Sequence, residues 1–410
     1  MRQYSRDMWV RWGVAVIGFF LTWQTIFILR PGWQCWWEGD VCTPFPLATI
    51  GVQFVDAVLL FGAGVGMWQW WRDDRRSLFW VSGLLVVLMV SNVWVSVDRA
   101  LTLIGWMRLV AFLFTLRSIP ADAAWRRAFL GGFVVAMLAH ASLGIAQFWT
   151  GNAWPSTLLG IAPHAAGTPG DAVLMIGRER FLRAYGGFPH PNILGTALLV
   201  GLIALLRLRD TTQRYGRLLM YASMLLLTMA LVLTFSRAAV IGFVIFMVLL
   251  LRERATRALA VTGGIWCAVL LLIGAPFLSP RFTAAGANEQ RSLMERRVGV
   301  QDAWLVWTRS PWMGVGLHAM PQALLRFARV DTQPVHNVPM LAMTEVGVIG
   351  VVVLVVLLVR FGLPVVRPSW EYLALLPSML FDHHLWSLPV GLALLLVLML
   401  RTPTPSSVHS

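Results

Sequence analysis

The chain alternates long apolar runs with short polar segments over almost its whole length. Apolar runs of about 20 residues are long enough to cross a bilayer as helices. About twelve such runs lie at residues 13–29, 47–71, 78–97, 100–116, 128–149, 190–206, 218–235, 237–251, 258–277, 339–359, 369–381 and 385–400. This pattern predicts an all-α polytopic membrane protein, because a β-barrel would show weaker, alternating segments.

Arginine in the short polar segments predicts the orientation of the chain. Cytoplasmic loops of membrane proteins are enriched in basic residues. With a cytoplasmic N-terminus, the expected inner segments all contain arginine: 72–76, 117–127, 207–217, 252–257, 360–367 and the tail from Arg401. We therefore expect a multi-pass membrane protein with both termini in the cytoplasm.

Two polar segments on the expected outer side are also rich in arginine, against this rule. One is 177–192, which begins within the outer segment 150–189, and the other begins the long interruption 280–345. The expected organisation is membrane helices over 1–277, a large outer loop over 278–338, and membrane helices with a cytoplasmic tail over 339–410. Arginines on the outer face suggest an anionic ligand there.

Composition supports a membrane protein and excludes an ordinary soluble one. The 410 residues are 58% hydrophobic and only 13% charged, whereas soluble proteins have about 25% charged residues. The net charge is +14, carried by arginine without any lysine. We expect a bilayer environment and no nucleic-acid partner.

Two of the three cysteines share one outer segment. Cys35 and Cys42 could form a disulfide there if the compartment is oxidising, or they could be two unrelated thiols. Cys267 lies within an apolar run. No histidine or further cysteine lies near the pair in sequence, which argues against a zinc site.

The large loop carries helical signals of its own. Apolar residues recur at helical spacing from Glu289 to Ser310, and Pro311 ends the run. This predicts an amphipathic helix lying at the membrane surface. A turn is expected at 314–316, and a second short helix is expected to begin at Pro321.

Several arginines could bind an anion on the outer face. Arg291, Arg296 and Arg297 occupy about two turns of the predicted helix, where they could clamp a diphosphate or simply contact solvent and lipid headgroups. Arg183 precedes two glycines that allow close backbone approach. Arg237 lies tightly between two spans, where an ionisable residue is a functional candidate.

A histidine at the end of the loop is the candidate base. His336 could take a proton from a sugar hydroxyl, with Asn337 orienting it or capping the next helix. Glu345 follows about two and a half turns into that helix, where it could orient the site or pair with an arginine.

The remaining charged residues of interest have plainer interpretations. The run 382–384, Asp-His-His, is interpreted as surface residues of a short outer turn, with a metal role left open. No DxD-type motif occurs in the outer loops, so we expect chemistry that needs neither a metal nor an organic cofactor. Within the spans, Asp56 and Arg108 are the clearest charges, and they could pair with each other.

Four groups of these residues together resemble the O-antigen ligase family, which shares its signature with O-antigen polymerases and protein O-oligosaccharyltransferases. The matching pieces cover roughly the C-terminal half of the chain. They are Arg183-Ala-Tyr-Gly-Gly-Phe-Pro-His190-Pro-Asn192, Thr234-Phe-Ser-Arg237, the run Arg297…Trp304…Pro311…Gly314-Val-Gly316, and His336-Asn337…Glu345-Val-Gly347…Gly350.

The resemblance implies a membrane glycosyltransferase fold (GT-C-like) with a periplasmic loop domain. Such enzymes transfer a glycan from undecaprenyl diphosphate to a sugar hydroxyl of lipid A–core. The resemblance makes His336 the expected base or acceptor-orienting residue. Arg183, Arg237 and the group Arg291, Arg296 and Arg297 would hold the diphosphate, with the other motif residues binding substrate: His190, Asn192, Asn337 and Glu345.

Two alternatives stay open at this point. A polymerase would use the same donor with a second lipid-linked glycan as acceptor. A transporter of an anionic lipid belongs to a different class and would show charges deep within several spans. The expected spans contain few charges, which favours the enzyme.

Overall fold

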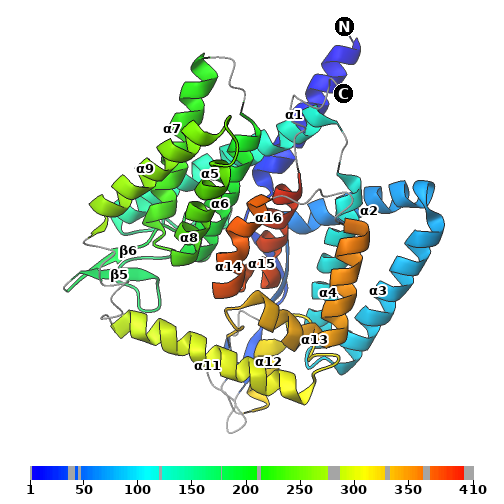
Figure 1. The fold of residues 1–410 in the computed structure, drawn as a ribbon. Helices are drawn as coiled ribbons and strands as arrows, with labels where there is room; N and C mark the ends of the chain where they lie inside the picture. Colours follow the sequence, from blue (N-terminus) through cyan, green and yellow to red (C-terminus); the bar gives the residue numbers. More distant parts are fainter. Residues whose placement is uncertain are drawn as a thin grey trace.

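The computed structural model describes residues 2–35, 42–44, 48–119, 122–176, 178–209, 214–275, 287–327, 333–362 and 370–400. Figure 1 shows two groups of helices, one formed by α5 to α9 and one by α2 to α4 with α13. Helices α14 to α16 lie between the groups, and α11 runs across one end of the molecule. The protein is therefore mainly helical, as the sequence predicts.

The first half of the chain contains most of the strands, as three two-stranded antiparallel pairs: β1 with β4, β2 with β3, and β5 with β6. Its elements are α1 (Arg2–Phe20), β1 (Ile26–Arg30), β2 (Trp33–Cys35), β3 (Cys42–Pro44), β4 (Ile50–Gln53), α2 (Phe54–Asp73), α3 (Arg75–Val95), α4 (Arg99–Thr115), η2 (Leu116–Ser118), α5 (Ala123–Thr150), β5 (Val173–Ile176) and β6 (Glu179–Leu182).

All the elements of regular structure among the described residues of the second half are helices. Its elements are α6 (Pro191–Arg207), α7 (Arg214–Leu233), α8 (Arg237–Leu250), α9 (Arg257–Ile273), α11 (Ala287–Arg309), α12 (Met320–Leu325), α13 (Val338–Leu357), η3 (Leu358–Gly362), η4 (Trp370–Leu375), α14 (Leu376–Phe381), α15 (His384–Ser387) and α16 (Pro389–Met399).

Helices long and apolar enough to cross a membrane are present among the described residues. Five meet both criteria: Arg75–Val95, Arg99–Ser118, Ala123–Thr150, Tyr215–Leu233 and Val338–Arg360. Five shorter apolar helices accompany them: Met8–Phe20, Pro191–Arg207, Arg237–Leu250, Arg257–Ile273 and Pro389–Met399. These helices fit a multi-pass membrane protein, while the number of twelve spans stays a prediction.

The first apolar run is not one continuous helix. α1 ends at Phe20, and the run continues as strand β1. Polar side chains cause the change, because the Trp23 indole nitrogen and the Thr25 hydroxyl both donate to the carbonyl of Leu158, at 2.8 Å each. These bonds attach the segment to the outer loop 150–172, where a continuing helix could not reach.

The last two expected spans are also broken. The region 369–381 forms η4 and the six-residue α14, and the region 385–400 forms the short α15 and the eleven-residue α16. Pro377 is the second residue of α14 and Pro389 is the first residue of α16, positions where proline favours a new helix over continuation of the old one. The turn between α14 and α15 therefore lies in the middle of the protein instead of at its surface.

Helix α6 is the centre of the first helix group. Apart from Asn192 and Arg207, all its residues are buried, as expected for a helix that is apolar on every side. At its C-terminal end, Arg207 donates to the carbonyls of Val397, Leu398 and Leu400 and pairs with Glu371. The ends of α6 and α16 therefore lie together, on the side expected to be cytoplasmic.

Helix α13 is interrupted at Gly347, which has φ of 68° and ψ of 177°. The segment 311–317 crosses the helix at this break. The Val315 and Gly316 N–H groups donate to the carbonyls of Thr344 and Glu345, at 3.1 and 3.0 Å. The segment bends at Val315 with positive φ at both flanking glycines, as the expected turn at 314–316 requires, and its backbone is bonded to the open helix.

Asp56 and Arg108 form a salt bridge, with Arg108 Nε 2.7 Å from Asp56 Oδ1. Arg108 also donates to the Gly51 carbonyl at 2.6 Å. The expected pairing is confirmed, and its function is to join α4 to the start of α2. In the outer segment before α2, the backbone register places Cys35 opposite Cys42, and the disulfide between them stays a prediction.

Candidate active site

The N-terminal ends of three helices meet at the expected outer side. Asn192 at the start of α6 donates to Asp382 Oδ2 at 3.0 Å, and Asn337 before α13 donates to the Leu380 carbonyl at 3.2 Å. The start of α8 packs against α6, since a Cβ at Gly195 would lie 2.8 Å from that of Ala239. Helix N-termini carry partial positive charge, so this arrangement favours an anion.

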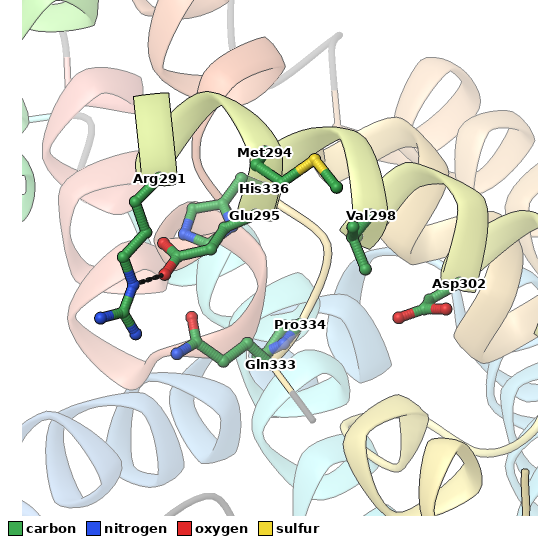
Figure 2. Close-up of a pocket in the computed structure, with 9 residues that line it drawn as sticks. Arg291, Met294, Glu295, Val298, Asp302, Gln333, Pro334 and His336 are labelled. Atoms are coloured by element: carbon green, nitrogen blue, oxygen red, sulfur yellow. Dashed lines mark hydrogen bonds and ion pairs between the residues drawn. The ribbon is translucent and has the colours of Figure 1, made fainter. Parts of the chain in front are cut away.

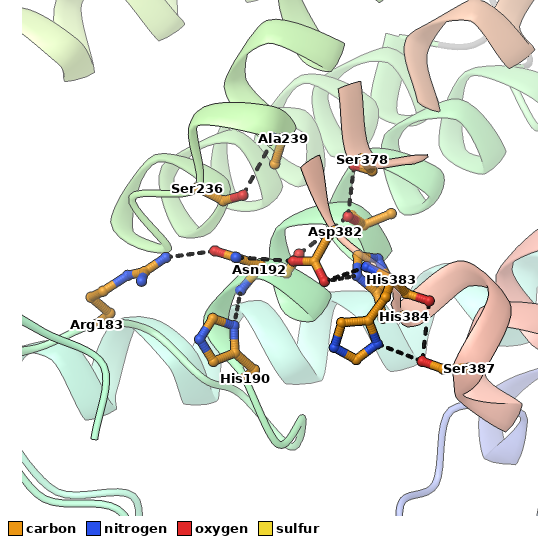
Figure 3. A network of polar contacts seen from close by, with 11 residues as sticks. Arg183, His190, Asn192, Ser236, Ala239, Ser378, Asp382, His383, His384 and Ser387 are labelled. Atoms are coloured by element: carbon orange, nitrogen blue, oxygen red, sulfur yellow. Dashed lines mark hydrogen bonds and ion pairs between the residues drawn. The ribbon is translucent and has the colours of Figure 1, made fainter. Parts of the chain in front are cut away.

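Arg183 is buried at the centre of these helix ends, with only 4% of its surface exposed. Its Nε donates to the Thr234 carbonyl at 2.7 Å, and its Nη2 donates to Asn192 Oδ1 at 2.8 Å. The Asn192 amide in turn donates to Asp382 (Figure 3). A chain of polar contacts therefore runs from Arg183 to Asp382.

The glycines after Arg183 let the backbone lie directly on α5. Gly186 has φ of 58°, and a Cβ there would come within 2.9 Å of the His140 carbonyl oxygen. Gln147 of α5 accepts from the Tyr185 N–H at 3.2 Å and donates to the Gly186 carbonyl at 2.8 Å. These contacts fix the position of Arg183.

His190 uses its ring to cap α6. Its Nδ1 accepts from the Asn192 N–H at 3.1 Å. Burial lowers the pKa of His190 to about 3, and the nearby positive charge of Arg183 adds to this shift. The imidazole is therefore neutral near pH 7, as an N-cap acceptor must be.

His336 lines a pocket of about 270 Å³ between α11 and the segment before α13 (Figure 2). The lining residues are Arg291, Met294, Glu295, Val298, Gly299, Asp302, Gln333, Pro334 and His336. Burial lowers the pKa of His336, and Arg296 contributes in the same direction while Asp382 opposes it. A neutral imidazole at the edge of a pocket can accept a proton from a bound hydroxyl group.

The interpretation of residues 382–384 as surface residues is wrong. Asp382 is 7% exposed and His384 is 1% exposed, because the break between α14 and α15 places this turn among the helices. His383 donates its N–H to Asp382 Oδ1 at 2.8 Å, and its Nδ1 lies 2.6 Å from Ser387 Oγ. The ring of His383 also meets that of His336, with centroids 5.2 Å apart.

Asp382 is ionised in this environment. Burial alone would raise the pKa of Asp382, but the neighbouring His384, His383 and His190 hold it well below the usual range. His384 Nδ1 lies 3.2 Å from Asp382 Oδ1. The buried His384 ring therefore lies against the Asp382 carboxylate.

The arginines of α11 do not converge on one point. Arg291 is exposed at the pocket and pairs with Glu295 at 2.7 Å. Arg296 is partly buried and close enough to affect the pKa of His336, whereas Arg297 is exposed and does not line the pocket. Arg237 is partly buried at the first position of α8.

Glu345 lies deeper in the protein than the other candidates. It is 1% exposed and accepts from the Trp386 indole nitrogen at 2.8 Å. It also accepts from the backbone of the segment at His318 and Met320. Glu345 thus connects α13 to α15 and to the start of α12.

Comparison with known protein families identifies one domain. The family model described as O-antigen ligase matches residues 222–355. This part of the chain is therefore similar to the O-antigen ligase family. The resemblance noted in the sequence is confirmed, and it indicates an enzyme of the O-antigen ligase or polymerase type. No curated protein and no solved structure matches the chain.

The O-antigen ligase match covers only part of the assembled site. It includes Arg237, the described part of α11, His336 and Glu345. Arg183 and Asn192 precede the matched residues, and Asp382 follows them. The fold nevertheless brings all three to the same helix ends, so the candidate site extends beyond the matched residues.

Sequence reasoning missed Asn92, which joins the crossing segment to α3. Its amide donates to the carbonyls of Met313 and Glu345 at 2.7 and 2.9 Å, and its Oδ1 accepts from Leu317 N and Trp106 Nε1 at 3.0 and 2.8 Å. A polar residue in the middle of an apolar run was the available signal. The sequence analysis considered Asp382 but not its burial, which depends on a helix break that the apolar pattern does not indicate.

Proposed function

We propose that this protein transfers an O-antigen glycan from undecaprenyl diphosphate to a sugar hydroxyl of lipid A–core, at the periplasmic face of the inner membrane. The observation that carries the proposal is the meeting of Arg183 and His336 around Asp382, at the ends of α6, α8 and α13. The Arg183 guanidinium suits the diphosphate of a lipid-linked donor. The His336 imidazole suits the hydroxyl group of an acceptor.

The donor diphosphate would bind at the helix N-termini. Arg183 is held by two hydrogen bonds at the start of α6, and Arg237 begins α8. Arg291 stands at the pocket on α11, with Arg296 and Arg297 on the same helix. Fixed cations and helix dipoles aimed at the leaving group stabilise the charge that develops as its bond breaks.

The acceptor hydroxyl would enter the pocket beside His336. Its oxygen attacks the anomeric carbon while the carbon–oxygen bond to the diphosphate breaks. His336 takes the hydroxyl proton or orients the hydroxyl, and undecaprenyl diphosphate leaves with the bonding electron pair. Direct displacement of this kind inverts the anomeric centre. Diphosphate is a good leaving group, so the step does not demand a metal.

The other motif residues support the two binding regions. Asn192 and His190 order the start of α6, next to the diphosphate. Asn337 caps α13 by accepting from the Met340 N–H at 2.9 Å, which places His336 directly before that helix. Glu345 holds α15 through Trp386.

Purified full-length protein in detergent provides the test. It would be mixed with undecaprenyl-diphosphate-linked glycan and lipid A–core in the presence of EDTA, and the glycan followed on a gel. We expect the glycan on lipid A–core. Glycan growing on its own carrier would make the protein a polymerase, and the absence of any covalent change would refute the proposal in favour of transport.

A further inference from the structure

Three potential metal ligands lie together beside the pocket, and one of them, His336, also lines it. Among the described residues, His336, Asp382 and His383 each offer a ligand atom within 4.8 Å of the other two. Ligand atoms around a tetrahedral zinc ion are about 3.4 Å apart, given zinc–ligand distances of about 2.0–2.2 Å. Small side-chain movements would therefore bring the three atoms to bonding distance.

Neighbouring residues already orient two of these ligands. Ser387 bonds to Nδ1 of His383 at 2.6 Å, which leaves Nε2 as the ring nitrogen available to a metal. Asp382 accepts from Asn192 and from the His383 N–H. A carboxylate has about four acceptor sites, so capacity for a metal remains. Such supporting hydrogen bonds are typical of metal ligands, because they fix ligand orientation.

The third ligand, His336, comes from a different segment, which is already bonded to the segment that carries Asp382 and His383. Asn337 donates to the Leu380 carbonyl at 3.2 Å, which holds the residue after His336 against α14. The rings of His336 and His383 meet nearly edge to face, at an interplanar angle of 78°. Little ordering of the chain would be needed on binding.

We infer that His336, Asp382 and His383 form a binding site for a divalent transition-metal ion of the zinc class. Two imidazoles and a carboxylate are the ligand set that such ions prefer. Three protein ligands leave a coordination position open, and the pocket beside His336 gives access to it.

Occupation of this site would inhibit the reaction. A metal bound to His336 occupies the nitrogen lone pair that, in the proposed function, accepts the proton of the acceptor hydroxyl. The same metal also binds Asp382 and so restrains His336. Zinc would thus act as a reversible inhibitor, and chelation would restore activity. This consequence rests on the proposed function, whereas metal binding itself does not.

Metal binding is tested directly on the full-length protein after treatment with EDTA and its removal. Zn²⁺ binding would be measured by calorimetry for the wild type, His383→Ala and His164→Ala. His164 also stands beside a carboxylate, at 2.7 Å from Asp171, and serves as the matched control. We expect His383→Ala to weaken binding ~10-fold or more, as loss of a ligand or its support does, with His164→Ala unchanged.

A second measurement uses only the wild-type protein, so it does not depend on whether a variant folds. Co²⁺ added to the wild type should give the intense visible absorption of a four- or five-coordinate site, and Zn²⁺ should displace it. Weak octahedral absorption, or equal zinc binding in the wild type and His383→Ala, would overturn the inference.

Inhibition is tested in the transfer assay. Zn²⁺ should stop glycan transfer by the wild type, EDTA should restore it, and His383→Ala should transfer with reduced sensitivity to zinc. If zinc binds as described but increases transfer, the inhibitory role is wrong. If zinc binds and no transfer occurs even with EDTA, the proposed function fails while the metal site stands.

Discussion

Gly314 lies directly against the backbone of Glu345, so that a Cβ at Gly314 would come within 2.3 Å of the Glu345 carbonyl oxygen. Gly347, at the break in α13, lies equally close to the crossing segment, because a Cβ at Gly347 would come within 2.3 Å of the Trp312 carbonyl oxygen. The Gly-Val-Gly and Glu-Val-Gly sequences therefore form one structure. It joins the loop that carries α11 to the helix that follows His336.

Gly314→Ala should destabilise this junction. The residue has φ of 67° and no space for a methyl group, so we expect a loss of roughly 2 kcal/mol or more from backbone strain and displacement. Thermal unfolding in detergent would measure it. Gly264→Ala is the control, because its Cβ would meet nothing within 4 Å; equal melting temperatures for the two variants would contradict the prediction.

Asn92→Ala should destabilise the protein by at least about 2 kcal/mol. Two buried donors, Leu317 N and Trp106 Nε1, would lose their shared acceptor, at ~1–3 kcal/mol each. The neighbouring Ser91→Ala is a suitable control, because the Ser91 hydroxyl bonds to Val87 in its own helix. A small effect at Asn92, similar to that at Ser91, would show that the crossing segment is held by other contacts.

Arg183→Lys should reduce glycan transfer ~100-fold or more, the typical cost of removing a fixed donor from a developing charge. Lysine cannot bond Thr234 and Asn192 through a planar fork. Arg180→Lys, on the preceding strand, should keep transfer, because Arg180 bonds the carbonyls of Ala166 and Thr168 in the outer loop. Equal activity in both variants would remove Arg183 from the site.

The stability of the protein should fall in acid, in part because of His318. Burial lowers the pKa of His318 to about 4 from 6.5, with Arg108 adding to the shift. The unfolded chain therefore binds a proton more readily, so this contribution is present above pH 6.5 and is lost as the pH falls to 4. The full loss is roughly 3 kcal/mol.

His318→Asn isolates this contribution. His318 has φ of 65°, in the left-handed region that asparagine tolerates well. Melting temperatures measured across the pH range should fall less steeply for the variant than for the wild type. Parallel curves would show that another group controls the acid sensitivity.

The outer cysteines should be oxidised in protein isolated from membranes. The backbone register places Cys35 opposite Cys42, and Cys267 is a free, buried thiol. Alkylation after unfolding without reductant should modify one cysteine, and alkylation after reduction should modify three. Three modified cysteines without reductant would place the segment in a reducing compartment and reverse the predicted orientation.

The apolar pattern predicted the helices that are apolar and uninterrupted. The expected runs 128–149 and 190–206 agree closely with α5 and α6, and the amphipathic period predicted α11. The pattern failed where an apolar run changes conformation, as at β1. Side chains such as Thr25 bond to a loop more than 130 residues away, and no local signal shows such a partner.

The candidate site was predictable only in its separate parts. Arg183 was identified because arginines are unexpected on the outer side of the membrane, and both Arg183 and His336 belong to the motifs that resemble the family. Their common neighbour Asp382 was assigned to the surface, because a short polar turn between apolar runs normally lies at the membrane boundary. The break between α14 and α15 brings it inward, and that depends on packing against α6.

The hydrogen bond between Asn192 and Asp382 joins residues 190 positions apart, and Arg207 reaches carbonyls that lie still later in the chain. During synthesis, α6 must therefore enter the membrane long before the partners that bond both of its polar ends exist. Contacts of such sequence separation form late in folding. A ribosome-bound chain that stops before Phe381 would hold Arg183 and Asn192 and still lack the carboxylate that Asn192 binds, so the site can be completed only after Asp382 has been synthesised and packed.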